Sequence, residues 1–432
     1  MQRKIVERHI IRPNNVHYQM LKEYCHLAKN LYNHGLYIIR QEFCKNNYWI
    51  RYGQLNKILK DDKEYLDYRN MPTAQMAQQV LRNLDSTMSS FFKANKDYKK
   101  HPNKYTGRPK LPKYKDKDGE MTFFLTNQNC KLTKDGIIHF PKKFKGFELK
   151  TKILENPDYI SFQQVKVKPM NGYLIIDVVY RENASDMKED NNRYLSIDPG
   201  LDNFATIVNN IGYPNIILDG KGLKSINRYF NKEISMTKSI LMKVNNSFNS
   251  KELDRLWLRR KNIIEDTLHK MSRYVINYAK GLDISIIYIG HNKRQKNELS
   301  LSKKLNQNFV QIPHEKFNQM LKYKAEKEGI QVIEVEESYT SKASFIDNDF
   351  IPTYGDIMSP VINNFNGKRI NRGLYQSKEG KLINADVNGA LNILRKVKPT
   401  AFNKLEVIAA GVSSPLRINF AWKGGNLNKS FA

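Results

Sequence analysis

Cysteine is scarce in this sequence: its 432 residues include three cysteines, Cys25, Cys44 and Cys130, which lie far apart. Isolated thiols exclude a disulfide framework and a four-cysteine zinc site, and they are typical of proteins in a reducing cytoplasm. Long apolar runs are missing too, because no window approaches the ~20 consecutive apolar residues of a transmembrane helix. The N-terminal residues MQRKIVERHI alternate charged and apolar positions, which is not the pattern of a signal peptide. We therefore expect a cytoplasmic protein.

Acidic residues are also in deficit. Asp and Glu number 43 against 72 Lys and Arg, which gives a formal net charge of +29 at pH 7. Hydrophobic residues make up 40% of the chain and aromatic residues 11%, which is too many for a disordered basic tail and enough for two or three domains. Cations spread along the whole chain indicate a polyanionic partner, because each Lys or Arg on a phosphate releases condensed counterions. An acidic membrane surface is the alternative, but the sequence has no basic amphipathic helix with a lipidation signal.

The first half of the sequence predicts a small β-barrel with a helical insertion. Residues 3–11 alternate like a half-buried strand, and apolar residues then recur at the three- and four-residue steps of a helix. A second helix is predicted from Thr73, a suitable N-cap, to Phe92. Strand-like runs follow at residues 121–125, 137–140, 162–167 and 173–179. Two domains are therefore expected, a β-barrel of residues 1–13 and 96–183 and a helical domain of residues 14–95.

Two stretches of this half carry side chains suited to nucleic acid. Residues 96–120 are dense in Lys, Pro and Gly with Tyr interleaved, and the prolines favour an extended chain. Basic side chains with stacking aromatics suit a groove that follows a phosphate backbone, whereas an ordinary solvated linker is the alternative. Polar residues beside the apolar stripe of the second helix could contact a duplex or could form a solvated face. The candidates are Gln75, Gln79, Arg82, Arg108, Lys110, Lys113, Tyr114 and Lys115.

The second half follows a different order of elements. After a polar linker at residues 184–193, three strands are predicted in succession, followed by a long helical hairpin within residues 226–280. A buried strand at residues 284–289 comes next, and the order continues with a helix, a strand and, after an irregular stretch, a short helix at residues 385–396. A three-strand meander followed by alternating helices and strands is the order of a ribonuclease-H-like fold. The whole chain is therefore expected to be a multi-domain α+β protein.

Two aspartates occupy places in this fold where a metal could be held. Asp198 lies near the end of the first strand, before the turn at Gly200, and Asp386 lies in the first turn of the last helix, beside the first strand. Alone, Asp198 could be a turn residue and Asp386 an acid favoured by the helix dipole. Together they indicate two-metal phosphodiester cleavage, which needs three or four carboxylates around two ions ~4 Å apart. Mg²⁺ suits such oxygen ligands.

Several blocks of residues occur in a specific order. In the second half they are Asp198-Pro-Gly-Leu-x-x-Phe-Ala-Thr, Arg259-Arg260-Lys261 with Asp266-x-x-His269-Lys270-x-Ser272, Ser338-Tyr339-Thr340-Ser341, and Asp386-x-Asn388-x-Ala390-x-Asn392. With Gln79-Val80-Leu81-Arg82-Asn83-Leu84 and Gly107-Arg108-Pro109-Lys110 in the first half, they resemble the TnpB family of transposon-encoded RNA-guided DNA nucleases, relatives of the type V CRISPR effectors.

The resemblance implies a domain plan and a set of partners. It implies a RuvC-like nuclease domain at residues 194–341 and 385–398, preceded by a β-barrel wedge domain and a helical recognition domain. It also implies a guide RNA, a double-stranded DNA target beside a short flanking motif, and Mg²⁺-dependent cleavage. Arg259 and Arg260 are expected to contact nucleic acid.

The chain departs from the family at the second catalytic carboxylate. In the family this acid usually follows the strand that corresponds to residues 284–289, but here that strand runs into Gly290. The next candidates are Glu336 and Glu337, at the end of the following strand, whose end faces the same edge of the sheet. Because strand residues alternate between faces and Glu337 shares the parity of the apolar Val335, we expect Glu337 to point inward, with Glu336 as second choice. A solvated acid pair is the alternative.

The second departure concerns zinc. In the family, two Cys-x-x-Cys pairs usually lie between the Tyr-Thr-Ser block and the last Asp, but residues 342–384 contain no cysteine, and the acids Asp347 and Asp349 there have no His partners. We therefore expect a lid without zinc over the active site, and a partly disordered C-terminal tail at residues 399–432. The lid residues suited to the phosphates of the cleaved strand are Lys368, Arg369 and Arg372, for which an ordinary basic loop is the alternative.

These features together predict an RNA-guided DNA endonuclease in which Asp198, Glu337 and Asp386 hold two Mg²⁺ ions and base pairing to the guide supplies sequence specificity. The protein would be bacterial in type, cytoplasmic, and associated with the nucleoid when on DNA. One alternative is an RNA-guided repressor that binds without cutting, which the missing acid after Ile289 favours. Another is a structure-selective resolvase without RNA, which the separate basic modules ahead of the nuclease disfavour.

Overall fold

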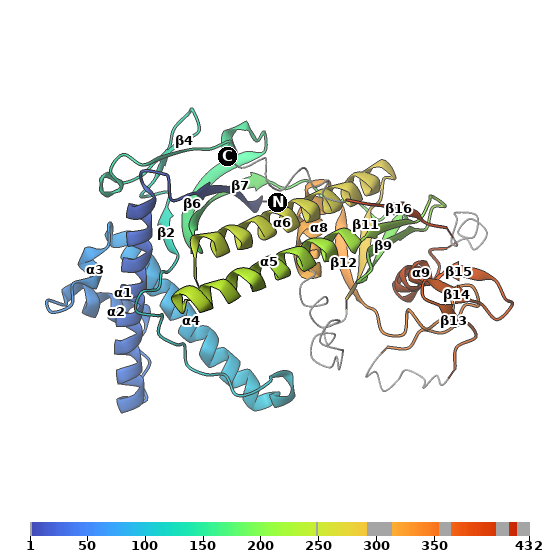
Figure 1. Cartoon of the computed structure of the whole chain (residues 1–432), viewed down its shortest axis with the longest axis horizontal. Helices are drawn as coiled ribbons and strands as arrows, with labels where there is room; N and C mark the ends of the chain where they lie inside the picture. The colour runs from blue at the N-terminus through green and yellow to red at the C-terminus, as the bar shows by residue number, and fades with distance from the viewer. Residues whose placement is uncertain (1, 248, 292–312, 354–363, 403–413, 421–432) are drawn as a thin grey trace. The chain divides into compact units, whose positions relative to one another are not determined.

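The computed structural model describes residues 2–247, 249–291, 313–353, 364–402 and 414–420 (Figure 1). The chain divides into two units, residues 1–184 and residues 185–432, each with its own apolar core. Within the described residues no helix is both long enough and apolar enough to cross a membrane. The sequence predicts a multi-domain protein that mixes helices and strands, and the structure confirms this.

The first unit contains two antiparallel sheets (Figure 1). The strand order of the larger sheet is β1-β7-β6-β2, formed by β1 (Gln2–Ile11), β7 (Tyr173–Asn183), β6 (Tyr159–Met170) and β2 (Phe123–Thr126). The smaller sheet contains β3 (Lys131–Leu132), β4 (Ile137–His139) and β5 (Glu148–Lys150).

The larger sheet is open, in contrast to the closed barrel that the sequence predicts. Among the described residues, its edge strands β1 and β2 do not pair with each other. A barrel closes only when its strands are long enough to take a tilted, staggered register with both neighbours. β2 has four residues against ten in β1 and twelve in β6, so it is too short to close the sheet.

Two long helices complete the first unit, α1 (Tyr18–Asn46) and α4 (Ala74–Lys100), with the shorter α2 (Tyr52–Asp61) and α3 (Asp67–Asn70) beside them. α4 begins where the sequence predicts, because the Thr73 hydroxyl accepts a hydrogen bond from the Met76 amide at 3.2 Å. The helix continues past its predicted end at Phe92 into the segment expected to be extended. No Pro or Gly occurs after Phe92 until Pro102, so nothing interrupts the helix earlier.

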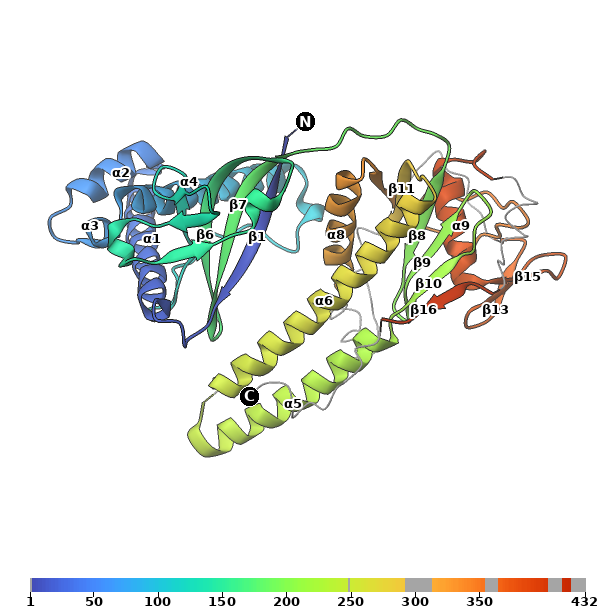
Figure 2. The same ribbon diagram turned by 90° about the horizontal axis from the view of Figure 1, so that it is seen from above.

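The second unit is built on a six-stranded sheet with the order β12-β11-β8-β9-β10-β16 (Figure 2). Its strands are β8 (Tyr194–Pro199), β9 (Asn203–Asn209), β10 (Ile216–Asp219), β11 (Ile286–His291), β12 (Gln331–Glu336) and β16 (Leu416–Ile418). β8, β9 and β10 form the predicted antiparallel meander, and β11 and β12 run parallel to β8 on its other side. β16 pairs with β10 within the expected tail, of which residues 403–413 and 421–432 lie outside the described residues.

Helices cover both faces of this sheet (Figure 2). α6 (Lys251–Gly281) and α8 (His314–Lys327) pack on one face, α9 (Ala385–Val397) packs on the other, and α5 (Lys221–Asn245) forms a hairpin with α6. These helices confirm the predicted ones, although α5 begins earlier than expected.

The alternation of side chains along β8 decides which residues face α9. Leu195 and Ile197 belong to the core under α6 and α8, whereas Tyr194 belongs to the core under α9. Asp198 shares the parity of Tyr194 and therefore lies on the α9 side of the sheet.

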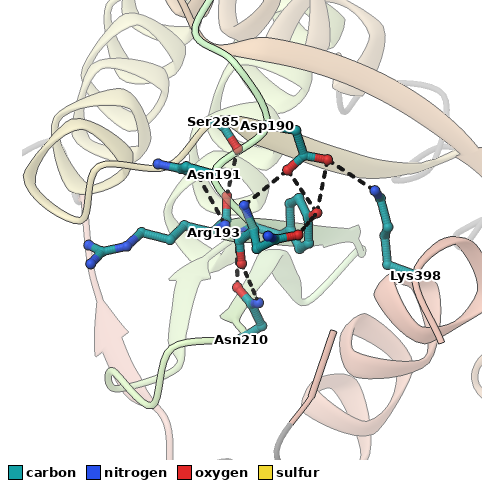
Figure 3. A network of polar contacts seen from close by, with 8 residues as sticks. Asp190, Asn191, Arg193, Asn210, Ser285 and Lys398 are labelled. Carbon is teal, nitrogen blue, oxygen red and sulfur yellow. Dashed lines mark hydrogen bonds and ion pairs between the residues drawn. The ribbon is translucent and has the colours of Figure 1, made fainter. Parts of the chain in front are cut away.

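A network of polar side chains fixes the start of β8 (Figure 3). Asp190 accepts hydrogen bonds from the Tyr194 hydroxyl at 2.8 Å and from Nζ of Lys398, just after α9, at 3.0 Å. On the other side, the hydroxyl of Ser285, just before β11, donates to the Arg193 carbonyl at 3.2 Å. β8 is thus tied to both β11 and α9 at one end, which holds its carboxyl end in register with them.

A small antiparallel sheet lies in the stretch where the sequence predicts a lid. It consists of β13 (Lys368–Asn371), β14 (Leu374–Gln376) and β15 (Leu382–Asn384). β15 leads directly into α9, and the Asn384 side chain caps that helix by accepting hydrogen bonds from the amides of Asp386 at 3.0 Å and Val387 at 3.2 Å. Residues 354–363 of the stretch lie outside the described residues.

Candidate active site

Three carboxylates reach the α9 side of the sheet from three different elements. Asp198 lies near the carboxyl end of β8, Glu337 directly follows β12, and Asp386 lies in the first turn of α9. A Cβ atom built on Gly389 of α9 would lie 2.7 Å from Asp198 Oδ2, so only glycine lets the helix approach this carboxylate so closely. A close contact between helix and strand therefore brings the two predicted aspartates to one place.

The electrostatics of Asp198 indicate that the three carboxylates share one site. Although Asp198 keeps some solvent exposure, burial raises its pKa well above the ordinary value, and the charges of Glu337 and Asp386 raise it further. Arg369 of β13 lowers the pKa of Asp198, and its Nη2 atom lies 3.4 Å from Asp386 Oδ1. Asn203 Nδ2 donates a hydrogen bond to Asp386 Oδ2. The site is rich in negative charge, and one arginine partly neutralises it.

The two acids at the end of β12, Glu336 and Glu337, lie in different environments. Glu336 is exposed, and its carboxylate pairs with Lys396 and accepts a hydrogen bond from the Ser338 amide at 2.9 Å. Partial burial raises the pKa of Glu336, but these hydrogen bonds outweigh it and the pKa is lowered overall. Burial, and then repulsion from Glu336, raise the pKa of Glu337 to about 7.

Glu337 fills the space beside Gly290, where the family usually has an acid at the end of the neighbouring strand. A Cβ atom built on Gly290 would lie 2.6 Å from Glu337 Oε2. Glu337 therefore points toward the site, as the parity of Val335 predicts, while Glu336 points away. The catalytic role of Glu337 stays a prediction.

The asparagines of the last sequence block hold the segment that follows Glu337. Asn388 and Asn392 of α9 are fully buried, and their Nδ2 atoms donate to the Ala343 carbonyl at 2.8 and 2.7 Å. Asn392 also donates to the Thr340 carbonyl at 2.9 Å, and the Thr340 hydroxyl donates to the Glu337 carbonyl at 2.8 Å. These residues position Glu337, a role that the spacing of the block does not reveal.

Asp347 and Asp349, the acidic pair singled out in the lid stretch, accept hydrogen bonds from neighbouring residues of that stretch. The Asp349 carboxylate accepts hydrogen bonds from the Ser344 amide at 2.8 Å and from the Asn366 side chain at 2.6 Å. Asp347 accepts a hydrogen bond from the Lys378 amide at 2.9 Å. Both acids stabilise the local fold of residues 342–384.

The three carboxylates are candidate ligands for a metal ion. Among the described residues, no group of three or more His, Cys, Asp and Glu lies at ligand spacing. The three carboxylates supply only oxygen donors, which hard divalent cations prefer, and a cation would relieve their mutual repulsion. The donor set therefore fits Mg²⁺ in kind, while Arg369 and Asn203 hold the oxygens of Asp386 in this structure.

Comparison with known proteins finds families and a curated relative that the chain resembles. Residues 177–296 match the family OrfB_IS605, described as a probable transposase, and residues 314–393 match the Cas12f1-like TNB domain. The TnpB-like protein ORF457 of Acidianus two-tailed virus is 25% identical over 235 residues, which cover 52% of this chain and 46% of that protein. These matches support the resemblance of the chain to the TnpB family. The chain spans about half the length of the curated relative that it matches.

Solved structures of CRISPR effectors are similar to this chain at low identity. A Cas12f1–sgRNA–target DNA complex is 14% identical, covers 87% of this chain and 82% of that chain, and has a TM-score of 0.49. CasPhi-2 (Cas12j) bound to crRNA and phosphorothioate DNA is 11% identical, covers 93% and 92%, and has a TM-score of 0.41. In sequence, Asp198 lies in the transposase match, and Glu337 and Asp386 lie in the TNB-domain match.

The candidate nucleic-acid residues of the first unit lie on α4 and on the segment that follows it. The Asn33 side chain of α1 exchanges two hydrogen bonds of 2.8 Å with the backbone of Lys115, and Arg40 stacks over the ring of Tyr114 at 5.0 Å. Gln75 and Gln79 are half-buried, and Gln75 donates to Gln128 at 2.6 Å. The exposed candidates are Arg82, Arg108, Lys110, Lys113, Tyr114 and Lys115.

The candidates of the second unit divide into helical and lid residues. Arg260 of α6 donates to Asn227 Oδ1 of α5 at 2.8 and 3.0 Å, so its guanidinium ties the hairpin together. Arg259 beside it is half-buried. Arg372 pairs with Asp202. The exposed candidates of the lid sheet are Lys368, Arg369 and Arg372.

Proposed function

We propose that this chain is a member of the TnpB family and an RNA-guided DNA endonuclease. The observation that carries the proposal is the shared site of Asp198, Glu337 and Asp386, whose mutual repulsion raises the pKa of Asp198 beyond the effect of burial. The sheet that presents them has three antiparallel strands followed by two parallel ones, which is the order of a RuvC-like domain. Acid-rich sites of this kind suit phosphodiester hydrolysis.

The residues of the site have distinct roles in this proposal. Two Mg²⁺ ions held by the three carboxylates would activate a water molecule and stabilise the leaving 3′ oxygen. To serve as a ligand, Asp386 must exchange its contacts with Arg369 and Asn203. Arg369 is exposed on β13, so it can turn from Asp386 to a phosphate of the cleaved strand. Asn392 and Thr340 keep Glu337 in place throughout.

The charge of the chain supports nucleic-acid partners. A net charge of +29 and the exposed cations at residues 108–115 suit a polyanion that runs along the first unit. In the proposed complex a guide RNA supplies sequence recognition by base pairing, and the protein contacts the backbone and a short flanking motif of the DNA target. The open sheet of the first unit would serve as the wedge domain, and helices α1 and α4 as the recognition domain.

The main alternative is an RNA-guided repressor that binds without cutting. It rests on the absence of an acid after Ile289. The position of Glu337 weakens this argument, because its carboxylate occupies the space that a side chain at Gly290 would take. A nuclease in which Glu337 supplies the second carboxylate therefore accounts for the site better than a catalytically inactive protein does.

A two-step experiment tests the proposal. The full chain is purified with the RNA that it retains, and that RNA is sequenced. The complex is then given Mg²⁺ and a plasmid library in which a match to the RNA lies beside a randomised flank. We expect one discrete RNA that maps beside the gene and linear plasmids that share one flank. Sequence-specific binding without cutting would establish the repressor instead, and the absence of retained RNA would refute the RNA-guided scheme.

A further inference from the structure

An open pocket of about 650 Å³ lies in the helical layer that covers the face of the sheet opposite α9. It is therefore separate from the carboxylate site. Its cationic side chains are Lys270, Arg273 and Lys324, and the imidazole of His269 also lines it. Its aromatic side chains are Tyr274, Tyr323 and Phe420. No acidic residue of the described chain lines it. Two of its members belong to the sequence block on α6 that the nuclease site does not use.

The inner part of the pocket holds Lys324, which donates its hydrogen bonds to neutral groups. Lys324 of α8 is 5% exposed, and its Nζ donates to the Ser272 hydroxyl at 2.7 Å and to the His269 carbonyl at 2.8 Å. Burial, and then the charge of Arg273, lower the pKa of Lys324 to about 8. Burial, and then Lys324, lower the pKa of His269. A bound anion would relieve this repulsion.

Within the described residues, the outer cations pair with an exposed acid, Asp266, and with a half-buried one, Glu328. Lys270 pairs with Asp266 one turn earlier on α6 at 2.6 Å, and both side chains are more than half exposed. Arg273 lies 3.7 Å from Glu328, which pairs more closely with Lys280 at 2.8 Å. Surface pairs of this kind are weak, so a phosphate can compete for both cations.

The aromatic side chains add stacking surface to this charge. The rings of Tyr274 and Phe420 meet edge to face with centroids 5.8 Å apart, and Tyr323 is 41% exposed. Aromatic faces beside cations are the combination with which proteins bind single-stranded nucleic acid without regard to sequence. The volume lies within the ~300–1,000 Å³ range of small-ligand pockets, which accommodates one nucleotide.

We propose that this pocket holds one unpaired nucleotide of a bound strand, with its phosphate on Lys270 and Arg273 and its base against the aromatic side chains. The inference rests on the proposed function, because it assumes that the chain binds nucleic acid. It adds a second contact point on the sheet face opposite the carboxylates. The strand is either the guide RNA or single-stranded DNA displaced from the target, and both offer the same phosphate and base chemistry.

Photo-crosslinking of the full chain tests the proposal. The probes are a short RNA with one 4-thiouridine, a DNA of the same sequence with one 4-thiothymidine, and that DNA annealed to its complement. Crosslinked peptides are mapped by mass spectrometry. We expect crosslinks at Tyr274 or Tyr323 with the single-stranded probes and few with the duplex. The single-stranded probe with the higher crosslinking yield, RNA or DNA, shows which kind of strand the pocket binds. The double variant Lys270→Gln with Arg273→Gln should lose these crosslinks about tenfold, whereas Lys251→Gln, an exposed residue on the same helix but outside the pocket, should keep them.

The outcomes separate this inference from the proposed function. Crosslinks elsewhere on the chain with none in the pocket would overturn the pocket assignment and leave nucleic-acid binding intact. Pocket crosslinks that persist in the double variant would overturn the phosphate role of its cations. Absence of any crosslink or binding would overturn the proposed function itself. Thermal denaturation of each variant shows whether it is folded, and Tyr323→Leu, which keeps an apolar side chain, serves as a second test of stacking.

Discussion

Replacing Gly290 with alanine adds one methyl group where β11 faces Glu337 and α9. The new carbon would lie 2.6 Å from Glu337 Oε2 and 2.7 Å from Ile393 Cδ1, well inside the ~3.5–4.0 Å of an ordinary carbon contact. Both neighbours must therefore move by about an ångström. Each contact is with the end of a flexible side chain, so the backbone of β11 can stay in place.

The expected cost in stability is small and the expected cost in activity is large. Overpacking a core costs about 1–3 kcal/mol, and the lower end applies because both neighbours can rotate. About 1 kcal/mol lowers the Tm of a unit of this size by roughly 2–4 °C. Misplacing a catalytic group by about 1 Å can reduce the rate about 100-fold. We therefore predict that Gly290→Ala folds, loses a few degrees in Tm and cuts target DNA about 100-fold more slowly.

The assay measures the single-turnover cleavage rate of the RNA-loaded protein and the Tm of the same preparation. Gly281→Ala is the matched control, because a Cβ atom there meets nothing within 4 Å, and it should change neither quantity much. Wild-type cleavage by Gly290→Ala would refute the reasoning, since it would mean that the position of Glu337 beside Gly290 does not matter to catalysis.

The remaining predictions concern the same acid, the charge of the chain and its thiols. Gly290→Glu combined with Glu337→Ala should cut faster than Glu337→Ala alone, because truncating Glu337 opens the space beside residue 290; equal rates would contradict a relocated acid. Nucleic-acid affinity should fall steeply between low and physiological salt, and a flat dependence would contradict phosphate binding by the cations. At pH 8 a thiol reagent should label exposed Cys44 quickly but not buried Cys25 and Cys130, because burial raises the pKa of both thiols; rapid labelling of three thiols in the native protein would contradict the fold.

The sequence predicts the helices and strands that have a strong hydrophobic period or a capping residue. It also predicts the orientation of side chains that depend on those elements. Thr73, the predicted N-cap, accepts the expected hydrogen bond from the Met76 amide. The inward orientation of Glu337 follows from the period of two along β12, because Val335 marks the buried face. The meander and the parallel strands follow from the order of the elements alone.

Features that depend on contacts between distant segments are not visible in the sequence. The sheet of the first unit is open because β2 is short, and strand length is hard to read from alternation over four residues. β13, β14 and β15 have three or four residues each, which leaves no periodic signal. Asn203 is adjacent to Asp386 only through the fold, and the need for glycine at position 389 arises from the close approach of α9 to β8.

The central claim is that Asp198, with Glu337 and Asp386, carries metal-dependent cleavage of DNA chosen by a guide RNA. Its most direct test compares the wild type with Asp198→Ala on one plasmid that matches the retained RNA, measuring binding and cutting in parallel with and without Mg²⁺. Glu336→Gln is the control, because Glu336 is exposed and paired with Lys396. The account predicts that all three proteins bind the target, that wild type and Glu336→Gln cut it only with Mg²⁺, and that Asp198→Ala does not cut. Cleavage by Asp198→Ala at the wild-type rate would contradict the account.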